Sequence, residues 1–161
     1  HCISSAASDV YKRQIIQLAR RLGMRQRIIA TACVYYFRFY SRNSYAATDP
    51  ILVLVTCVYV AGKVEEGPSR IRIICSEASK MLEELGYTGF FNHIGPVAEM
   101  EFYLLEELEF DLIVFHIYPT LDDLCLRCAR SLQEETKQDT FNPSLEPIPE
   151  PVDESLLQMA W

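Results

Sequence analysis

One run of thirteen residues, Pro50 to Gly62, carries no charged side chain and is apolar over most of its length. Asp49 before it is a favourable helix N-cap, and Pro50 suits the first turn of a helix. A helix that is apolar on nearly every side must be surrounded by other elements. The run is too short for a membrane span, which needs about 20 apolar residues. We therefore expect the central helix of a soluble all-α domain, over residues 50–66, ended by Gly67 and Pro68.

Further helices flank this central one on both sides. Apolar residues recur there at the spacing of one helix face, with polar residues on the other. The remaining segment, residues 110–118, is rich in β-branched side chains, but nothing nearby would pair with it as a strand, so we expect an extended connector. The expected additional helices cover residues 15–22, 25–42, 70–85, 96–108 and 120–135.

The two ends of the chain differ from its middle. Residues 1–14 have weak apolar patterning, and we interpret them as a tail or a sequencing scar outside the fold. Residues 139–152 hold four of the eight prolines among acidic residues, which indicates a solvated linker with polyproline character. Residues 153–161 begin an amphipathic helix that is cut short. We therefore interpret the chain as a fragment shortened at both ends.

Charge is divided unevenly along the chain. Residues 1–48 hold eight basic side chains and one acidic, a charge of +7, and the remainder holds seven basic and twenty-one acidic, a charge of −14. The basic part could steer an acidic partner, and two oppositely charged solvated faces are the simpler interpretation. The net charge of −7 argues against general binding of nucleic acid.

Motifs of catalysis are absent from the sequence. The glycines are isolated, so no phosphate-binding loop exists, and no G-x-S-x-G or H-E-x-x-H motif occurs. Cys125 and Cys128 have the spacing of a metal or redox pair, but zinc needs four ligands and no second pair follows, so core cysteines are the preferred interpretation. Six cysteines without a visible signal peptide favour a reducing intracellular compartment. We expect no catalytic residue, no metal and no cofactor.

Two charges lie beside apolar surface. Lys63 ends the charge-free helix, and Glu101 is surrounded by Met100, Phe102 and Tyr103. A charge at the rim of an apolar surface is costly to desolvate unless it meets a partner. Either the two residues pair with each other, or they jointly meet the backbone of another protein.

These residues also form a family pattern. The segment Ala61 to Glu66 reads small, small, Lys, x, Glu, Glu, and Glu101 and Phe110-Asp111-Leu112 follow at matching distances. The combination resembles the cyclin box, and the resemblance covers about residues 15–124 and returns at 156–161. Within the cyclin family it is most similar to the transcriptional branch that serves the Mediator kinase module. No arginine is followed three positions later by leucine, which favours a transcriptional over a mitotic cyclin.

The resemblance implies a fold with one complete domain. A five-helix cyclin box would form around the central helix over residues 15–112, with its N-terminal helix shortened. Residues 113–138 would supply a connector and the first helix of a second cyclin box. The linker 139–152 would lead to a truncated helix of that second box, over residues 153–161.

The resemblance also implies a function. The chain would be a non-catalytic regulatory subunit that binds and activates a cyclin-dependent kinase of the Mediator complex, in the nucleus, beside other subunits of the kinase module. It would act as an activator or repressor of transcription by RNA polymerase II. No direct binding of nucleic acid, membrane or small-molecule ligand is expected.

The kinase-binding site follows from the same resemblance. Lys63 and Glu101 would hydrogen-bond to main-chain groups at the end of the kinase αC helix, and apolar side chains would surround them. The expected kinase-binding residues are Lys63, Val64, Glu66, Glu101, Leu105, Phe110 and Leu112. Two alternatives stay open: a cyclin-fold scaffold of the TFIIB type that binds DNA and polymerase, and a redox or zinc protein that uses Cys125 and Cys128.

Overall fold

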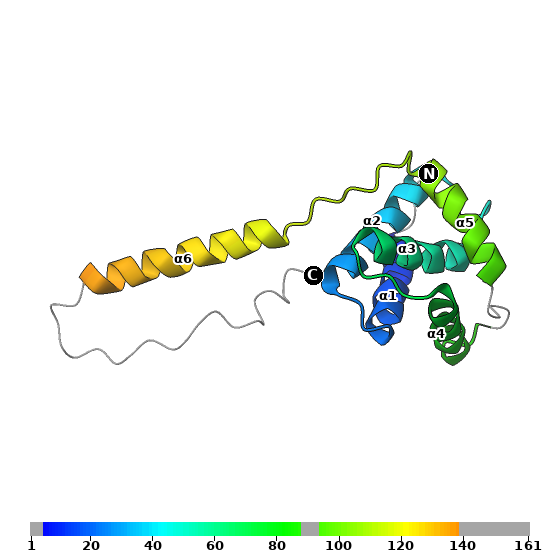
Figure 1. The fold of residues 1–161 in the computed structure, drawn as a ribbon, viewed down its shortest axis with the longest axis horizontal. Coiled ribbons are helices and arrows are strands. Elements are labelled where there is room, and N and C mark those ends of the chain that lie inside the picture. Colours follow the sequence, from blue (N-terminus) through cyan, green and yellow to red (C-terminus); the bar gives the residue numbers. More distant parts are fainter. Residues whose placement is uncertain (1–4, 88–93, 139–161) are drawn as a thin grey trace. The chain divides into compact units, whose positions relative to one another are not determined.

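The computed structural model describes residues 5–87 and 94–138, and side chains over 9–87 and 94–131. These residues form six helices and no strand (Figure 1), which confirms the expected all-α class. The helices are α1 (Ser5–Arg21), α2 (Gln26–Arg42), α3 (Pro50–Val64), α4 (Ile71–Glu84), α5 (Ile94–Glu107) and α6 (Tyr118–Gln138). The chain divides into two compact units, the first ending at Val114 and containing α1 to α5, the second containing α6.

Helix α3 is the centre of the first unit, as the charge-free run predicts. It packs against α1, α2, α4 and α5, and the side chains of Val53, Val55 and Val58 are fully buried. The Asp49 carboxylate caps its first turn by accepting a 3.0 Å hydrogen bond from the Ile51 amide. The central apolar helix is therefore surrounded on all sides by amphipathic ones.

The end of α3 comes two residues before the expected end at Glu66. Glu66 adopts a left-handed conformation with φ of 54°, and the Gly67 amide donates back to the Gly62 carbonyl at 2.9 Å. This arrangement satisfies a carbonyl that would otherwise lack a partner at the helix end. Glu66 therefore lies in the turn after α3 and not in the helix.

Helix α1 corrects the interpretation of residues 1–14. The helix begins at Ser5, and not at residue 15 as expected. Tyr11 stacks on Tyr45 with ring centroids 5.6 Å apart, and Gln14 is buried. Tyr11, Ile15 and Leu18 follow one another at i, i+4 and i+7, so a single helix face carries all three into the core. The described part of the opening segment thus belongs to the domain.

The remaining boundaries lie within a few residues of those expected. Helix α5 begins at Ile94, two residues before the expected start, so Pro96 lies in the first turn, where its missing N–H breaks no helical hydrogen bond. The connector after α5 is extended, with no strand among the described residues, as expected. Residues 139–152 and 153–161, the expected linker and truncated helix, lie outside the described residues. None of the described helices is long and apolar enough to cross a bilayer.

Candidate functional site

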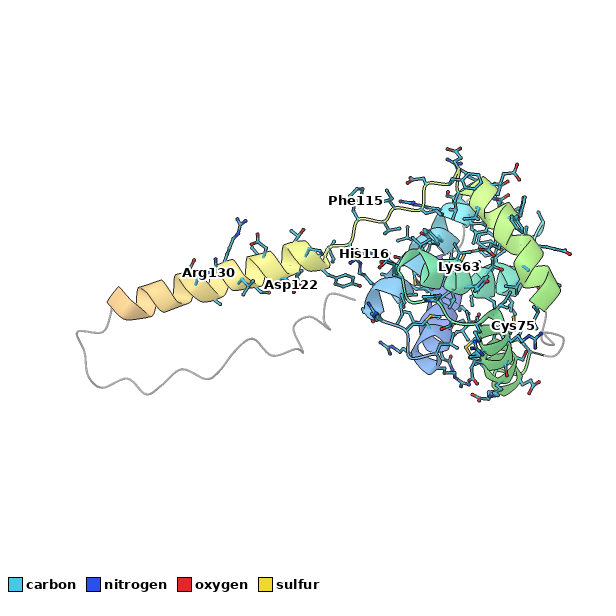
Figure 2. The ribbon with its side chains drawn as sticks, in the orientation of Figure 1. Lys63, Cys75, Phe115, His116, Asp122 and Arg130 are labelled. Carbon is cyan, nitrogen blue, oxygen red and sulfur yellow. The ribbon has the colours of Figure 1, made fainter. Side chains whose placement is uncertain are left out.

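Lys63 and Glu101 pair with each other across α3 and α5. The Lys63 Nζ lies 2.6 Å from Glu101 Oε1 and 4.2 Å from the centroid of the Tyr59 ring, one turn earlier on α3. The Glu101 side chain is 15% exposed and that of Lys63 is 42% exposed. Figure 2 labels Lys63 on α3 at this position. The sequence leaves open whether Lys63 and Glu101 pair with each other or jointly meet the backbone of another protein. The structure shows that they pair with each other.

The ion pair favours the charged form of Lys63 and leaves its ammonium group able to donate a further hydrogen bond. Burial by itself lowers the pKa of Lys63, but the hydrogen bond to Glu101 and the contact with Tyr59 outweigh burial, so the pKa is raised. An ammonium group has three N–H donors, and the contacts with Glu101 and Tyr59 use two of them. Lys63 therefore has one donor left for an acceptor of a partner.

A second polar contact fixes the C-terminal end of α3. Thr31 on α2 donates a 2.7 Å hydrogen bond to Glu65 Oε1, and Arg27 Nε lies 3.2 Å from Glu65 Oε2. Val64 is half-buried against the core, whereas Glu66 is exposed. Glu65 thus holds the junction between Val64, the last residue of α3, and Glu66 in the turn that follows, and it was not among the expected site residues.

The C-terminal end of α5 forms a tight turn that presents Phe110. Glu109 and Phe110 both have left-handed backbones, with φ of 53° and 57°. The Phe110 amide donates to the Leu105 carbonyl at 3.0 Å, and the Asp111 amide donates to the Leu108 carbonyl at 2.9 Å. The Phe110 side chain is 70% exposed as a result.

Helix α2 holds the backbone that follows this turn. The Tyr35 hydroxyl donates a 2.6 Å hydrogen bond to the Leu112 carbonyl, and Arg38 Nη1 donates a 2.9 Å hydrogen bond to the Asp111 carbonyl. Leu112 itself is half-buried against the core. The structure therefore brings the expected residues to two places, the end of α3 and the end of α5, joined by the Lys63–Glu101 pair. We call these residues together the α3–α5 face.

Three further side chains that were not expected lie on the elements that form the α3–α5 face. Phe102 on α5 is 74% exposed and Ile113 in the connector is 68% exposed, and Tyr59 lies under the Lys63 ammonium. A signal for Phe102 exists in the sequence. The buried residues of α5 include Met100 and Leu104, and position 102 falls on the other side of a helix with 3.6 residues per turn.

Cys125 and Cys128 were expected to be core residues, and neither is fully buried in the structure. Cys125 is half-buried and Cys128 is exposed within the second unit, whereas Cys33, Cys57 and Cys75 are buried in the first. Among the described residues, no group of three or more His, Cys, Asp and Glu side chains is placed to hold a metal ion.

Four helices pack around the apolar α3, and the sequence of this domain matches a known family. Residues 8–113 match the family model described as Cyclin, N-terminal domain. The chain therefore belongs to the cyclin family, as the sequence pattern predicted. The match begins inside α1, in agreement with the corrected boundary of the domain.

Several relatives of this chain have names that refer to RNA polymerase II or to cyclin C. It is 47% identical over 120 residues to the "RNA polymerase II holoenzyme cyclin-like subunit" of Mycosarcoma maydis, covering 74% of this chain and 30% of that protein. The protein of that name from Yarrowia lipolytica is 43% identical over 124 residues, covering 76% and 42%. "Cyclin-C" of Drosophila pseudoobscura pseudoobscura is 42% identical over 136 residues, covering 75% and 50%. The chain thus spans between 30% and 50% of the length of these relatives.

Proposed function

We propose that this chain is part of a non-catalytic regulatory subunit that binds and activates a cyclin-dependent kinase of the Mediator complex. In this role it regulates transcription by RNA polymerase II in the nucleus, together with other subunits of the kinase module. The cyclin fold and the printed names of the relatives, RNA polymerase II holoenzyme cyclin-like subunit and Cyclin-C, support the proposal.

The α3–α5 face is the proposed kinase-binding surface. One observation supports this assignment most directly: α5, which the Lys63–Glu101 pair joins to α3, exposes Phe102, and the turn after it exposes Phe110. A large apolar side chain exposed to water is stabilised when a partner covers it, and charged groups give strong hydrogen bonds to main-chain atoms. The two kinds of contact together suit a protein interface with an apolar core and charged anchors.

Activation would follow from which kinase conformation the face binds. A protein kinase is competent when its β3 lysine and αC glutamate are paired, which requires αC to be held inward. A subunit that binds the inward state more tightly than the outward one shifts the population by that difference in affinity. Lys63 and Glu101 would make their additional hydrogen bonds to the end of αC.

The experiment compares two ion pairs on the same domain. The test variant is Lys63→Ala/Glu101→Ala, and the matched control is Lys80→Ala/Glu77→Ala, which removes a surface pair of the same 2.6 Å length on α4. In a pull-down with the Mediator-associated kinase and an assay of its activity, the test variant should lose at least about tenfold in affinity, about 1.4 kcal/mol. The control should bind as the wild type does. Wild-type binding by the test variant would remove the assigned site.

A second pair of variants tests the apolar part of the face. Phe110→Ala removes an aromatic side chain that is 70% exposed, so folding should be little affected, yet kinase affinity should fall about tenfold or more. Phe115→Ala removes a similar side chain, 93% exposed, from the second unit, and should leave affinity unchanged. Equal affinities of the two variants would exclude Phe110 from the interface.

A further inference from the structure

Helix α1 carries basic side chains that the proposed kinase contact does not use. Arg13 and Arg20 are both exposed, and neither has a carboxylate partner among the described side chains. Arg21 beside them pairs with Glu84 of α4. Two unpaired guanidinium groups are therefore available to an external anion.

The two arginines frame an open hollow on the surface of α1. Ile16 and Gln17 lie between them in sequence, and the hollow of about 500 Å³ is lined by Arg13, Ile16, Gln17, Arg20 and Arg21. Positions 13 and 20 are seven residues apart, so they lie on one helix face about 10 Å from each other along the axis. Ile16 gives the hollow an apolar side chain between the charges. We call these five residues the α1 surface.

We propose that the α1 surface binds an acidic peptide segment of a partner protein. A peptide in the polyproline II conformation has three residues per turn and rises about 3.1 Å per residue. Two carboxylates three residues apart therefore lie on one side of the peptide, about 9 Å from each other, which is close to the axial separation of Arg13 and Arg20. Arginine guanidinium groups present paired N–H donors that fit carboxylates, so charge and spacing select the same class of ligand.

Nucleic acid suits this surface less well than a peptide does. The chain has a net charge of −7, and α1 packs against α4, which exposes Glu83 and Glu84. A polyanion longer than the hollow would approach these carboxylates. A short segment with two carboxylates gains the arginine contacts without that repulsion.

The α1 surface is separate from the α3–α5 face. Helices α1 and α5 both pack against α3, and they make no contact with each other among the described residues. We expect a kinase on the α3–α5 face to leave the α1 surface open. The acidic partner would be a second one that binds the domain at the same time, so the α1 surface goes beyond the proposed function.

The experiment measures fluorescence anisotropy of a labelled peptide, Ser-Glu-Leu-Ala-Glu-Ser, with the whole chain. The wild type should bind, and Arg13→Gln/Arg20→Gln should weaken binding about tenfold or more. The matched control, Arg70→Gln/Arg72→Gln, removes two exposed arginines at the start of α4 and should bind as the wild type does. Circular dichroism would check that both variants keep their helix content.

Three results would overturn the proposal. Unchanged peptide affinity in Arg13→Gln/Arg20→Gln would exclude the α1 surface. If a peptide with both glutamates replaced by glutamine bound as tightly as the original peptide, the negative charges would not contribute to binding. Tighter binding of a DNA duplex than of the peptide, lost in the same variant, would make nucleic acid the ligand. Kinase capture by Arg13→Gln/Arg20→Gln should stay at the wild-type level, so failure here is distinguishable from failure of the proposed function.

Discussion

The hydroxyl of Tyr35 donates a 2.6 Å hydrogen bond to the main-chain carbonyl of Leu112, which joins the core of α2 to the backbone that follows α5. We expect Tyr35→Phe to lower the free energy of unfolding by about 1–2 kcal/mol, because the carbonyl loses its donor in a partly buried place. Denaturant unfolding would measure this change. Tyr103→Phe, at a tyrosine that is 39% exposed, is the control and should change stability by less. Equal losses would contradict a special role for Tyr35.

Stability should fall in alkaline solution. Burial raises the pKa of Tyr35 to about 12 from an ordinary value of 10.0, and burial also raises the pKa values of Tyr36 and Tyr40. The folded state therefore holds these protons more tightly than the unfolded state does. The free energy of unfolding should be insensitive to these groups below about pH 10 and should decrease as pH rises above it. Denaturant unfolding across this range would show the decrease, and Tyr35→Phe should make it shallower. A rise in stability above pH 10 would contradict the prediction.

The Lys63–Glu101 pair should show coupling in a double-mutant cycle. Lys63→Met leaves a Glu101 carboxylate that is 15% exposed without its cation, so we expect a loss of about 1–2 kcal/mol in stability. Lys63→Met/Glu101→Leu removes both charges and should recover part of that loss. Unfolding of the wild type, both single variants and the double variant would give the coupling. Strict additivity would show that the pair contributes nothing to the fold.

Thiol reactivity should separate the two units. Burial raises the pKa of the Cys33 thiol to about 11, and the pKa of Cys57 is raised well above its ordinary value by burial. The thiolate is the reactive form of cysteine. Brief alkylation at pH 8 followed by peptide mass spectrometry should therefore label Cys128, which is exposed, and leave Cys33 and Cys57 unmodified. Equal labelling of all three would show that the core opens readily.

The helices could be predicted from the sequence wherever apolar spacing and end signals agreed. The run after Asp49 has no charge, so the centre of the bundle was predictable from it alone. The end of α3 was not, because it depends on a left-handed backbone at Glu66 and a return hydrogen bond from Gly67. The start of α1 was missed because its opening is rich in serine and alanine, and the partial burial of Tyr11 and the burial of Gln14 depend on what packs over them.

The candidate site was predictable where charged residues stand next to apolar ones in the sequence. Lys63 and Glu101 stood out as charges beside apolar residues, and the structure pairs them. The exposure of Phe102 depends on the rotation of α5 against α3, which spacing constrains but does not fix. The position of Phe110 depends on two successive left-handed residues at the end of α5, and neither is a glycine that would signal such a turn.

The separation of α1 from α5 by α3 also has an electrostatic consequence. Helix α1 carries four basic residues and one acidic, whereas α5 carries four glutamates and no basic residue. The opposite charges of α1 and α5, which both pack against α3, give the domain an electric dipole. During diffusion this dipole favours orientations in which each side faces molecules of the opposite charge. Encounter rates at the two sides should both slow as ionic strength rises, because salt screens this field. The charge distribution of the fold would thus orient the domain toward the two proposed partners before any contact forms.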